Sequence, residues 1–159
     1  GKAIANSGGI IAGKKSIIDH LRYYCPHLIY STALTPGVLA GVEKVLDIVV
    51  DEFCNLSKRM WEYKESIQHA LCSSGFSIIP GQAPINSIVA GSPVQTILLA
   101  KEFFKNHILT TPFIFPSVPL NEGRVRLIAG ANLHEKTVQA VLAAIPGIAQ
   151  RFHETCPSQ

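Results

Sequence analysis

The chain begins with the segment GKAIANSGGIIAGKK, residues 1–15, and the rest of the sequence can be interpreted outward from it. Lys2 stands between the small residues Gly1 and Ala3, and a Ser7-Gly8-Gly9 turn and a short apolar run follow. A lysine amine is nucleophilic only when it is deprotonated, so a reactive lysine needs surroundings that favour the neutral form. Small neighbours leave room beside the amine for a flat ring. Lys2 is therefore a candidate nucleophile, although a Gly-Lys pair alone is common.

Length and composition indicate a globular protein with a real core. The 159 residues are 47% hydrophobic and 16% charged, with a formal net charge of +3. The basic residues are scattered and are not interleaved with aromatic residues, so the pattern argues against a nucleic-acid partner. No apolar run approaches the roughly 20 residues of a membrane helix, and no signal-peptide pattern is present, so no membrane partner is expected.

Cysteines and histidines do not form a metal-binding or disulfide pattern. The four cysteines are far apart in the sequence without a C-x-x-C pair, and the six histidines lack ligand spacing. We therefore expect neither a zinc site nor a disulfide framework, and a reducing cytoplasm is the default location. Because the chain opens on Gly-Lys without an initiator Met, we expect it to be the downstream portion of a longer polypeptide.

The first half of the sequence predicts helices and short extended segments. We expect a strand over 10–12, a helix over 14–24 and, after Pro26, an extended segment over 27–34. Thr35-Pro36 is a typical N-cap and first helical position, and a helical region follows to about residue 75. Forty residues are long for one globular helix, so we expect a bend or break near 54–57.

The second half alternates short strands with helices. Strands are predicted over 76–79, 85–90, 108–115 and 124–129. Ser92-Pro93 should cap a helix that runs to about residue 107, and a last helix over 135–152 contains Pro146. This order predicts a small α/β sandwich, in which a sheet carries helices on one face.

The whole series of motifs resembles the C-terminal portion of the α-oxoamine synthases, enzymes that use pyridoxal 5′-phosphate (PLP). The motifs are Gly-Lys, Ser-Gly-Gly, PHLIYST at 26–32, Thr-Pro before a long helix, FPSVP at 115–119 and GRVR at 123–126. Segment 27–32 is most like the biotin-pathway member, which condenses a pimeloyl thioester with alanine. FPSVP fits the glycine acetyltransferase about as well.

The resemblance implies an α/β fold of the fold type I PLP transferases. Residues 1–34 would be the end of the PLP-binding large domain, 35–75 a long linking helical region and 76–159 the small C-terminal α/β domain. The implied activity is the condensation of an amino acid, alanine or glycine, with an acyl-CoA or acyl thioester, with loss of CO2. The family also implies a cytoplasmic homodimer.

The family's functional residues match four positions here. Lys2 would hold PLP as a Schiff base and then act as a base at the substrate α-carbon. Ser31 and Thr32 match a segment that reaches the cofactor phosphate from the neighbouring subunit, and Thr32 is the preferred residue. Arg126 matches the arginine that grips the substrate carboxylate with its planar fork. Arg124 shares its strand face, so the motif alignment alone decides between them.

The sequence also departs from the family. The histidine that relatives carry before the last helix is shifted by one position at His134, and we assign no role to His27. The acid for the pyridinium nitrogen, a stacking histidine, a glycine-rich phosphate cup and an acyl-CoA surface are not found in this sequence. We therefore expect the chain alone to be inactive. A non-catalytic interaction domain and a regulatory amino-acid-binding module remain as alternatives.

Overall fold

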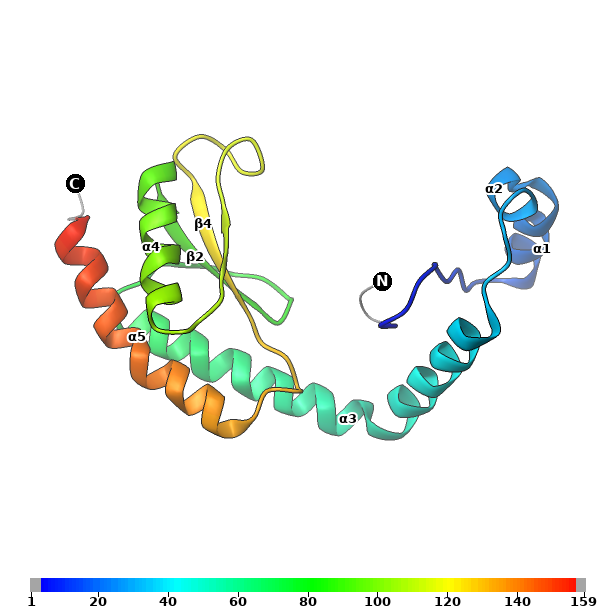
Figure 1. The fold of residues 1–159 in the computed structure, drawn as a ribbon, viewed down its shortest axis with the longest axis horizontal. Coiled ribbons are helices and arrows are strands. Elements are labelled where there is room, and N and C mark those ends of the chain that lie inside the picture. Colours follow the sequence, from blue (N-terminus) through cyan, green and yellow to red (C-terminus); the bar gives the residue numbers. More distant parts are fainter. Residues whose placement is uncertain (1–3, 157–159) are drawn as a thin grey trace. The chain divides into compact units, whose positions relative to one another are not determined.

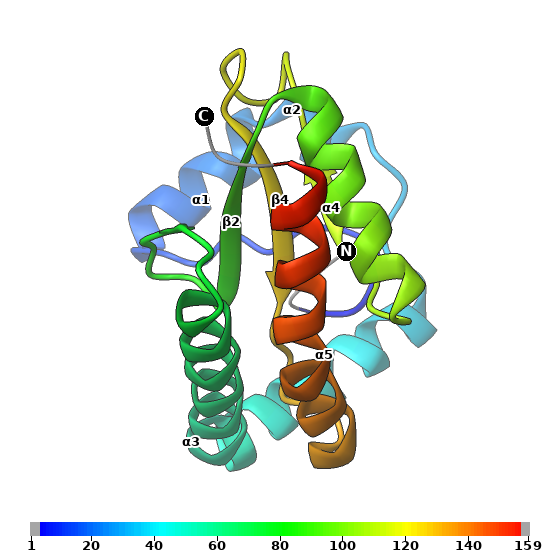
Figure 2. The same cartoon turned by 90° about the vertical axis from the view of Figure 1, so that its left-hand side faces the viewer.

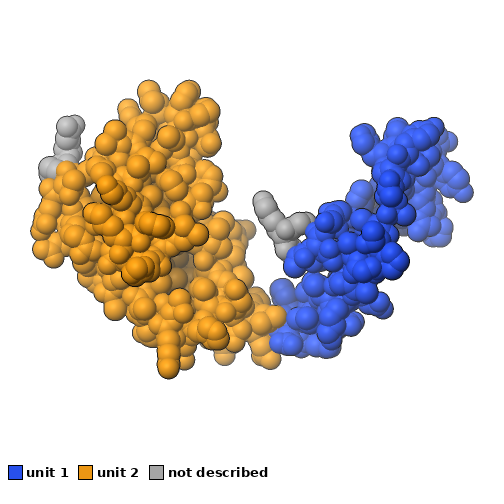
Figure 3. Space-filling view, viewed as in Figure 1, with its two compact units in different colours: residues 1–53 blue, residues 54–159 orange. Residues whose placement is uncertain are grey.

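The computed structural model describes residues 4–156 and divides the chain into two compact units, 1–53 and 54–159 (Figure 3). Lys2 lies outside the described residues. In chain order the helices are α1 (Lys15–Tyr24), α2 (Pro26–Ile29), α3 (Pro36–Ser73), α4 (Pro93–Lys105) and α5 (Glu135–Thr155). The strands are β1 (Ile78–Ile79), β2 (Ile85–Gly91), β3 (Thr111–Phe113) and β4 (Gly123–Ile128).

The first unit is helical, and two of our expectations for it are wrong. Residues 10–12 do not form a strand, because the described part of this unit, 4–53, contains no strand for them to pair with. The expected extended segment over 27–34 instead begins with the short helix α2. Pro26 occupies its first turn, where the fixed φ of proline suits a helix and its missing N–H costs nothing.

Helix α3 begins at Pro36, as predicted, and continues to Ser73. The helical assignment is uninterrupted at 54–57, so the helix does not break there, and the expected bend stays a prediction. The division between the two units falls within this helix, between Phe53 and Cys54.

The second unit contains a four-stranded antiparallel sheet in the order β1-β2-β4-β3. Helices α4 and α5 lie on the same side of β2 and β4 (Figures 1 and 2). This is the predicted sheet with helices on one face. The third expected strand, 108–115, is shorter than predicted and is paired only over Thr111–Phe113.

One apolar core joins the sheet to its helices. Its buried side chains come from the C-terminal part of α3, from the segment before β1, from β2 and β4, and from α4 and α5. The largest apolar side chains that are fully buried are Phe103, Leu71, Ile88, Leu99, Ile145, Ile148 and Val125. By contrast, no residue of 4–53 is buried within the part of the chain that the structure describes. The packed core of the described chain therefore lies in the second unit, where it can hold the strands in fixed positions.

Local signals explain the start of α4. Ser92 and Gln95 form a capping box: the backbone N–H of Gln95 donates to Ser92 Oγ (3.3 Å), and the Ser92 N–H donates to Gln95 Oε1 (2.9 Å). Pro93 occupies the first turn. These contacts satisfy backbone donors that a helix start leaves free.

Helix α5 continues through Pro146 to Thr155, so the proline does not end it.

Candidate active site

Strand β4 places two arginines on the side of the sheet that faces away from the helices. Along β4, Val125 and Leu127 are buried in the core, whereas Arg124 and Arg126, which alternate with them, are half-buried. Successive side chains of a strand point to opposite faces, so both arginines lie on the other face of the sheet. We call this the open face, and the expectation that the two arginines share it is confirmed.

Arg126 lies over an aromatic ring on the open face. Its guanidinium carbon Cζ is 4.0 Å from the ring centroid of Phe113 on β3. Among residues 4–156, no carboxylate lies within ion-pair distance of Arg126. A guanidinium can lie flat on the face of an aromatic ring, and its N–H groups then point along its own plane and away from the ring. Arg126 can therefore still donate hydrogen bonds to an anion.

Arg124 is in a different environment. Its Nη2 lies 3.4 Å from Glu122 Oε2, and its Nε is buried without a hydrogen-bond partner in the described chain. The ion pair is exposed on the carboxylate side and contributes little to stability. It nevertheless places a negative charge beside Arg124. An incoming carboxylate would therefore meet less competition at Arg126, and the geometry favours Arg126 over Arg124.

The sheet register surrounds Arg126 with small polar side chains. Ser87 on β2 and Thr111 on β3 are its direct cross-strand partners. Direct partners project to the same face, so both hydroxyls share the open face with the guanidinium. Sequence reasoning missed Ser87, Thr111 and Phe113, because only the strand register brings them beside Arg126.

The first unit contains the other predicted site residues. Ser31 and Thr32 directly follow α2, and both are exposed. Neither hydroxyl makes a hydrogen bond within residues 4–156. Both are therefore free to donate to a ligand, and they belong to a different unit from Arg126.

The segment that follows Lys2 is attached to the start of α3. Asn6 Nδ2 donates to the backbone carbonyl of Val38 at 3.1 Å. The contact requires a glycine at position 41, because a Cβ there would lie 2.6 Å from that nitrogen. At Gly8, whose φ is 99°, an added Cβ would lie 3.2 Å from Leu34 Cδ2. These contacts fix the residues on the C-terminal side of Lys2 within the first unit.

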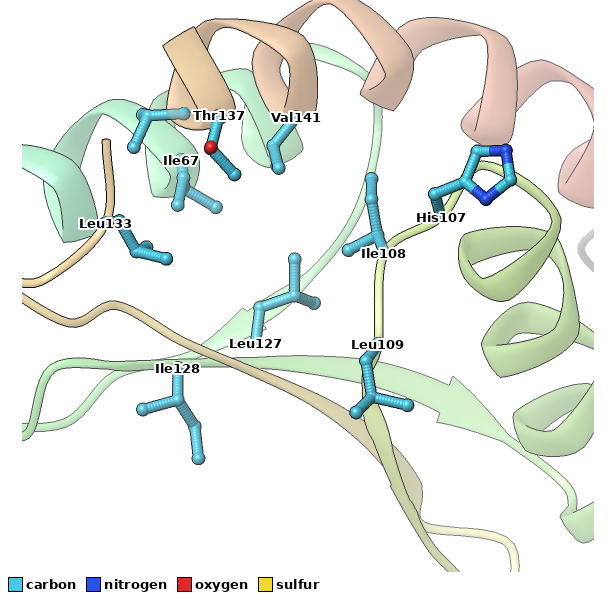
Figure 4. A pocket seen from close by; sticks show the side chains of 10 residues that line it. Ile67, His107, Ile108, Leu109, Leu127, Ile128, Leu133, Thr137 and Val141 are labelled. Atoms are coloured by element: carbon cyan, nitrogen blue, oxygen red, sulfur yellow. The ribbon is translucent and has the colours of Figure 1, made fainter. Parts of the chain in front are cut away.

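A separate apolar pocket of about 180 Å³ opens between the helices and one end of the sheet (Figure 4). Figure 4 shows Ile67, Thr137 and Val141 on the helix side and Leu127 on the strand side. His107 is the only ionisable residue in its lining. The pocket offers shape and apolar surface but no cluster of groups for acid–base chemistry.

The described residues contain neither a metal-binding cluster nor a membrane-spanning helix. Within residues 4–156, no group of three or more His, Cys, Asp or Glu side chains could hold a metal ion. No helix in the described part of the chain is long and apolar enough to cross a membrane.

Solved structures share this fold. A serine palmitoyltransferase variant from S. paucimobilis, with a bound PLP–myriocin aldimine, superposes on 95% of this chain with a TM-score of 0.82 at 15% identity, over 38% of its own length. An 8-amino-7-oxononanoate synthase from Francisella tularensis covers 94% of the chain with a TM-score of 0.75, over 44% of its length. The fold is that of the fold type I PLP transferases, as the sequence predicted.

Curated relatives agree with the fold. The 8-amino-7-oxononanoate synthase of Thermoanaerobacter pseudethanolicus is 26% identical over 152 residues, 96% of this chain and 38% of the relative. The 2-amino-3-ketobutyrate coenzyme A ligase of Escherichia coli is 29% identical over 145 residues, 90% of this chain and 36% of the relative. The chain thus spans between a third and two fifths of the curated relatives it matches.

A family model matches residues 1–145, most of the chain and both of its units. The chain belongs to the aminotransferase class I and II family.

Proposed function

We propose that this chain is part of a PLP-dependent acyltransferase. The enzyme would condense an amino acid, alanine or glycine, with an acyl-CoA or acyl thioester and release CO2. Our first candidate for this activity is that of 8-amino-7-oxononanoate synthase in biotin synthesis. The observation that carries this proposal is the position of Arg126, a half-buried guanidinium with no acidic partner among residues 4–156, at a position that matches the family's motif.

Arg126 would bind the carboxylate of the amino acid. Its fork can donate two parallel N–H bonds to the two oxygens, which orients the substrate about the carboxylate carbon. The hydroxyls of Ser87 and Thr111 flank that position on the neighbouring strands. Orientation matters because the bond to be broken must be held in a defined direction for the reaction to be fast.

The residues of the first unit have chemistry that fits PLP. Ser31 and Thr32 offer two free hydroxyl donors for a phosphate group, and in the proposed homodimer they would reach the neighbouring subunit's site. Lys2 would hold the cofactor through its amine and afterwards move a proton at the substrate α-carbon. PLP, when bound, supplies an electron sink for the bonds at that carbon.

The chain alone is proposed to be inactive. It spans about 38% of the length of the Thermoanaerobacter and S. paucimobilis proteins, and the groups that those enzymes need beyond the matched part would have to come from outside these 159 residues. We place the complete enzyme in the cytoplasm.

A second candidate is glycine C-acetyltransferase, also called 2-amino-3-ketobutyrate coenzyme A ligase. The chain is 29% identical to the Escherichia coli protein of this name and 26% identical to the Thermoanaerobacter 8-amino-7-oxononanoate synthase, so sequence identity supports the two candidates about equally. The alternative that is not an enzyme is an interaction domain. If it is correct, addition of PLP should not change the absorbance spectrum of the chain.

The test is a titration of the purified chain with PLP, followed by absorbance, with and without the upstream region of a relative added as a separate polypeptide. We expect a new band near the visible edge that Lys2→Ala abolishes and that Lys14→Ala, at an exposed lysine of the same unit, leaves unchanged. A shift of the band with alanine, or with glycine instead, would identify the amino acid. Absence of a Lys2-dependent band with the complement present contradicts the proposal and favours the interaction domain.

A further inference from the structure

Phe113 is the aromatic residue that contacts Arg126, and its place follows from the sheet register. Thr111 is the direct cross-strand partner of Arg126, and Phe113 is the direct partner of Arg124. Phe113 is therefore the diagonal neighbour of Arg126 on the open face. Diagonal neighbours are roughly 7–8 Å apart, which long and aromatic side chains can bridge. The observed distance of 4.0 Å from Cζ to the ring centroid shows that Arg126 crosses this diagonal.

The two arginines divide the local partners between them. The guanidinium of Arg124 lies near Glu122 at 3.4 Å, although Phe113 is directly opposite it. The guanidinium carbon of Arg126 lies over the ring, and no described carboxylate pairs with Arg126. Phe113 thus contacts the guanidinium of Arg126, and Glu122 contacts that of Arg124.

We propose that Phe113 is a positioning residue for the carboxylate-binding Arg126, an inference that rests on the proposed function. A guanidinium that stacks on a ring is restricted to one plane, yet its N–H donors remain in that plane and stay available. A carboxylate partner would fix Arg126 equally well but would occupy those donors. Phe113 therefore restricts the orientation of the Arg126 guanidinium without occupying the N–H donors that the substrate carboxylate needs.

Preorganisation gives the expected size of the effect. A flexible arginine loses rotamer freedom when it binds a ligand, and ordering it in advance removes part of that cost. Cation–π contacts at exposed sites are worth about 0.5–1 kcal/mol, which corresponds to a change of about two- to fivefold in a dissociation constant. Loss of the ring should weaken amino-acid binding by about that factor.

The experiment uses the full chain, with ¹⁵N-labelled arginine, and follows the Nε–Hε resonance of Arg126 by NMR. L-Alanine and glycine are the probes, and alaninamide, which lacks the carboxylate, is the ligand control. Four proteins are compared: the wild type, Phe113→Leu, Phe113→Tyr and Phe104→Leu, the last at an exposed phenylalanine on α4. The fluorescence of Trp61, the single tryptophan, checks that each variant is folded.

In the wild type, the ring current of Phe113 should displace the Arg126 resonance, and alanine should move it further. Phe113→Leu should remove the ring-current shift and weaken alanine binding about two- to fivefold. Phe113→Tyr should retain both the ring-current shift and the affinity for alanine, and Phe104→Leu should leave both unchanged. Alaninamide should not bind to any of the four proteins.

Three results would overturn the inference: no alanine-dependent change at Arg126 in the wild type, equal weakening by Phe113→Leu and Phe113→Tyr, or an unchanged Arg126 resonance in Phe113→Leu. Failure of the proposed function is distinguishable, because it is reported by the Lys2-dependent PLP band. Aromatic-dependent alanine binding without that band would leave the role of Phe113 in place and indicate an amino-acid-binding module.

Discussion

Replacement of Gly123 by alanine should destabilise the second unit. Gly123 begins β4 and pairs with Gly91 at the end of β2. An added Cβ would overlap the hydroxyl of Thr96 on α4 and would lie 2.8 Å from the carbonyl oxygen of Gly91 and 3.1 Å from Thr96 Cβ. The close approach of α4 to the sheet at this point therefore requires a residue without a side chain.

The structure indicates the size of this effect. Thr96 is fully buried, and its Oγ1 donates to the Ser92 carbonyl at 2.8 Å, so it cannot move aside without losing that bond. Overpacking of a core costs about 1–3 kcal/mol, and loss of a hydrogen bond costs about 0.5–1.5 kcal/mol. We expect Gly123→Ala to lower the free energy of unfolding by about 2–4 kcal/mol and Tm by about 4–16 °C.

Thermal unfolding followed by far-UV circular dichroism and by Trp61 fluorescence measures the change. Gly81→Ala is the matched control, since a Cβ at that glycine meets no atom within 4 Å. In a double-mutant cycle, Thr96→Ala removes the overlapping hydroxyl, so the double variant should be less destabilised than the sum of the two single variants. A wild-type Tm for Gly123→Ala, or strict additivity in the cycle, would refute this account of the contact.

Three smaller effects follow from local contacts. Ser92→Ala removes half of the capping box and should cost about 0.5–2 kcal/mol in thermal unfolding. Gly41→Ala should displace Asn6 and make residues 4–13 more sensitive to limited proteolysis; Gly37→Ala, which has open space, should not. The hydrogen bond from Lys105 and, next, that from Arg151 hold the pKa of Glu102 below its ordinary 4.5 despite the opposing effect of burial. The ionised Glu102 therefore stabilises the folded state fully above pH 4.5, and this stabilisation is lost as pH falls through the lowered pKa. Glu102→Gln should accordingly lower Tm at neutral pH but not near pH 2.

Local sequence signals predicted most of the elements. The starts of α3 and α4 follow from Thr35-Pro36 and Ser92-Pro93, whose backbone and side-chain chemistry acts within one turn of the helix. Strand alternation also predicted that Arg124 and Arg126 share a face. Each of these signals involves residues that are close in the sequence.

The errors arose where the outcome depends on a distant partner or on an ambiguous residue. The apolar run 10–12 resembles a buried strand, but a strand exists only if another strand pairs with it, and none does within residues 4–53. Pro26 follows the end of α1, and the same residue also suits the first turn of the next helix, α2. The sequence alone does not show whether a proline follows the end of one helix or lies in the first turn of the next.

The contact between Phe113 and Arg126 depends on strand register, and Pro112 helps to define that register. Proline has no N–H, so an edge strand accepts it without cost only where its nitrogen points away from the neighbouring strand. Strand β3 lies at the edge of the sheet, and its Pro112 pairs with the buried Val125. A slip by one residue would turn Phe113 away from the open face and would also turn the proline nitrogen toward β4. Pro112, which carries no chemistry, therefore disfavours the registers shifted by one residue, in which Phe113 would leave the open face.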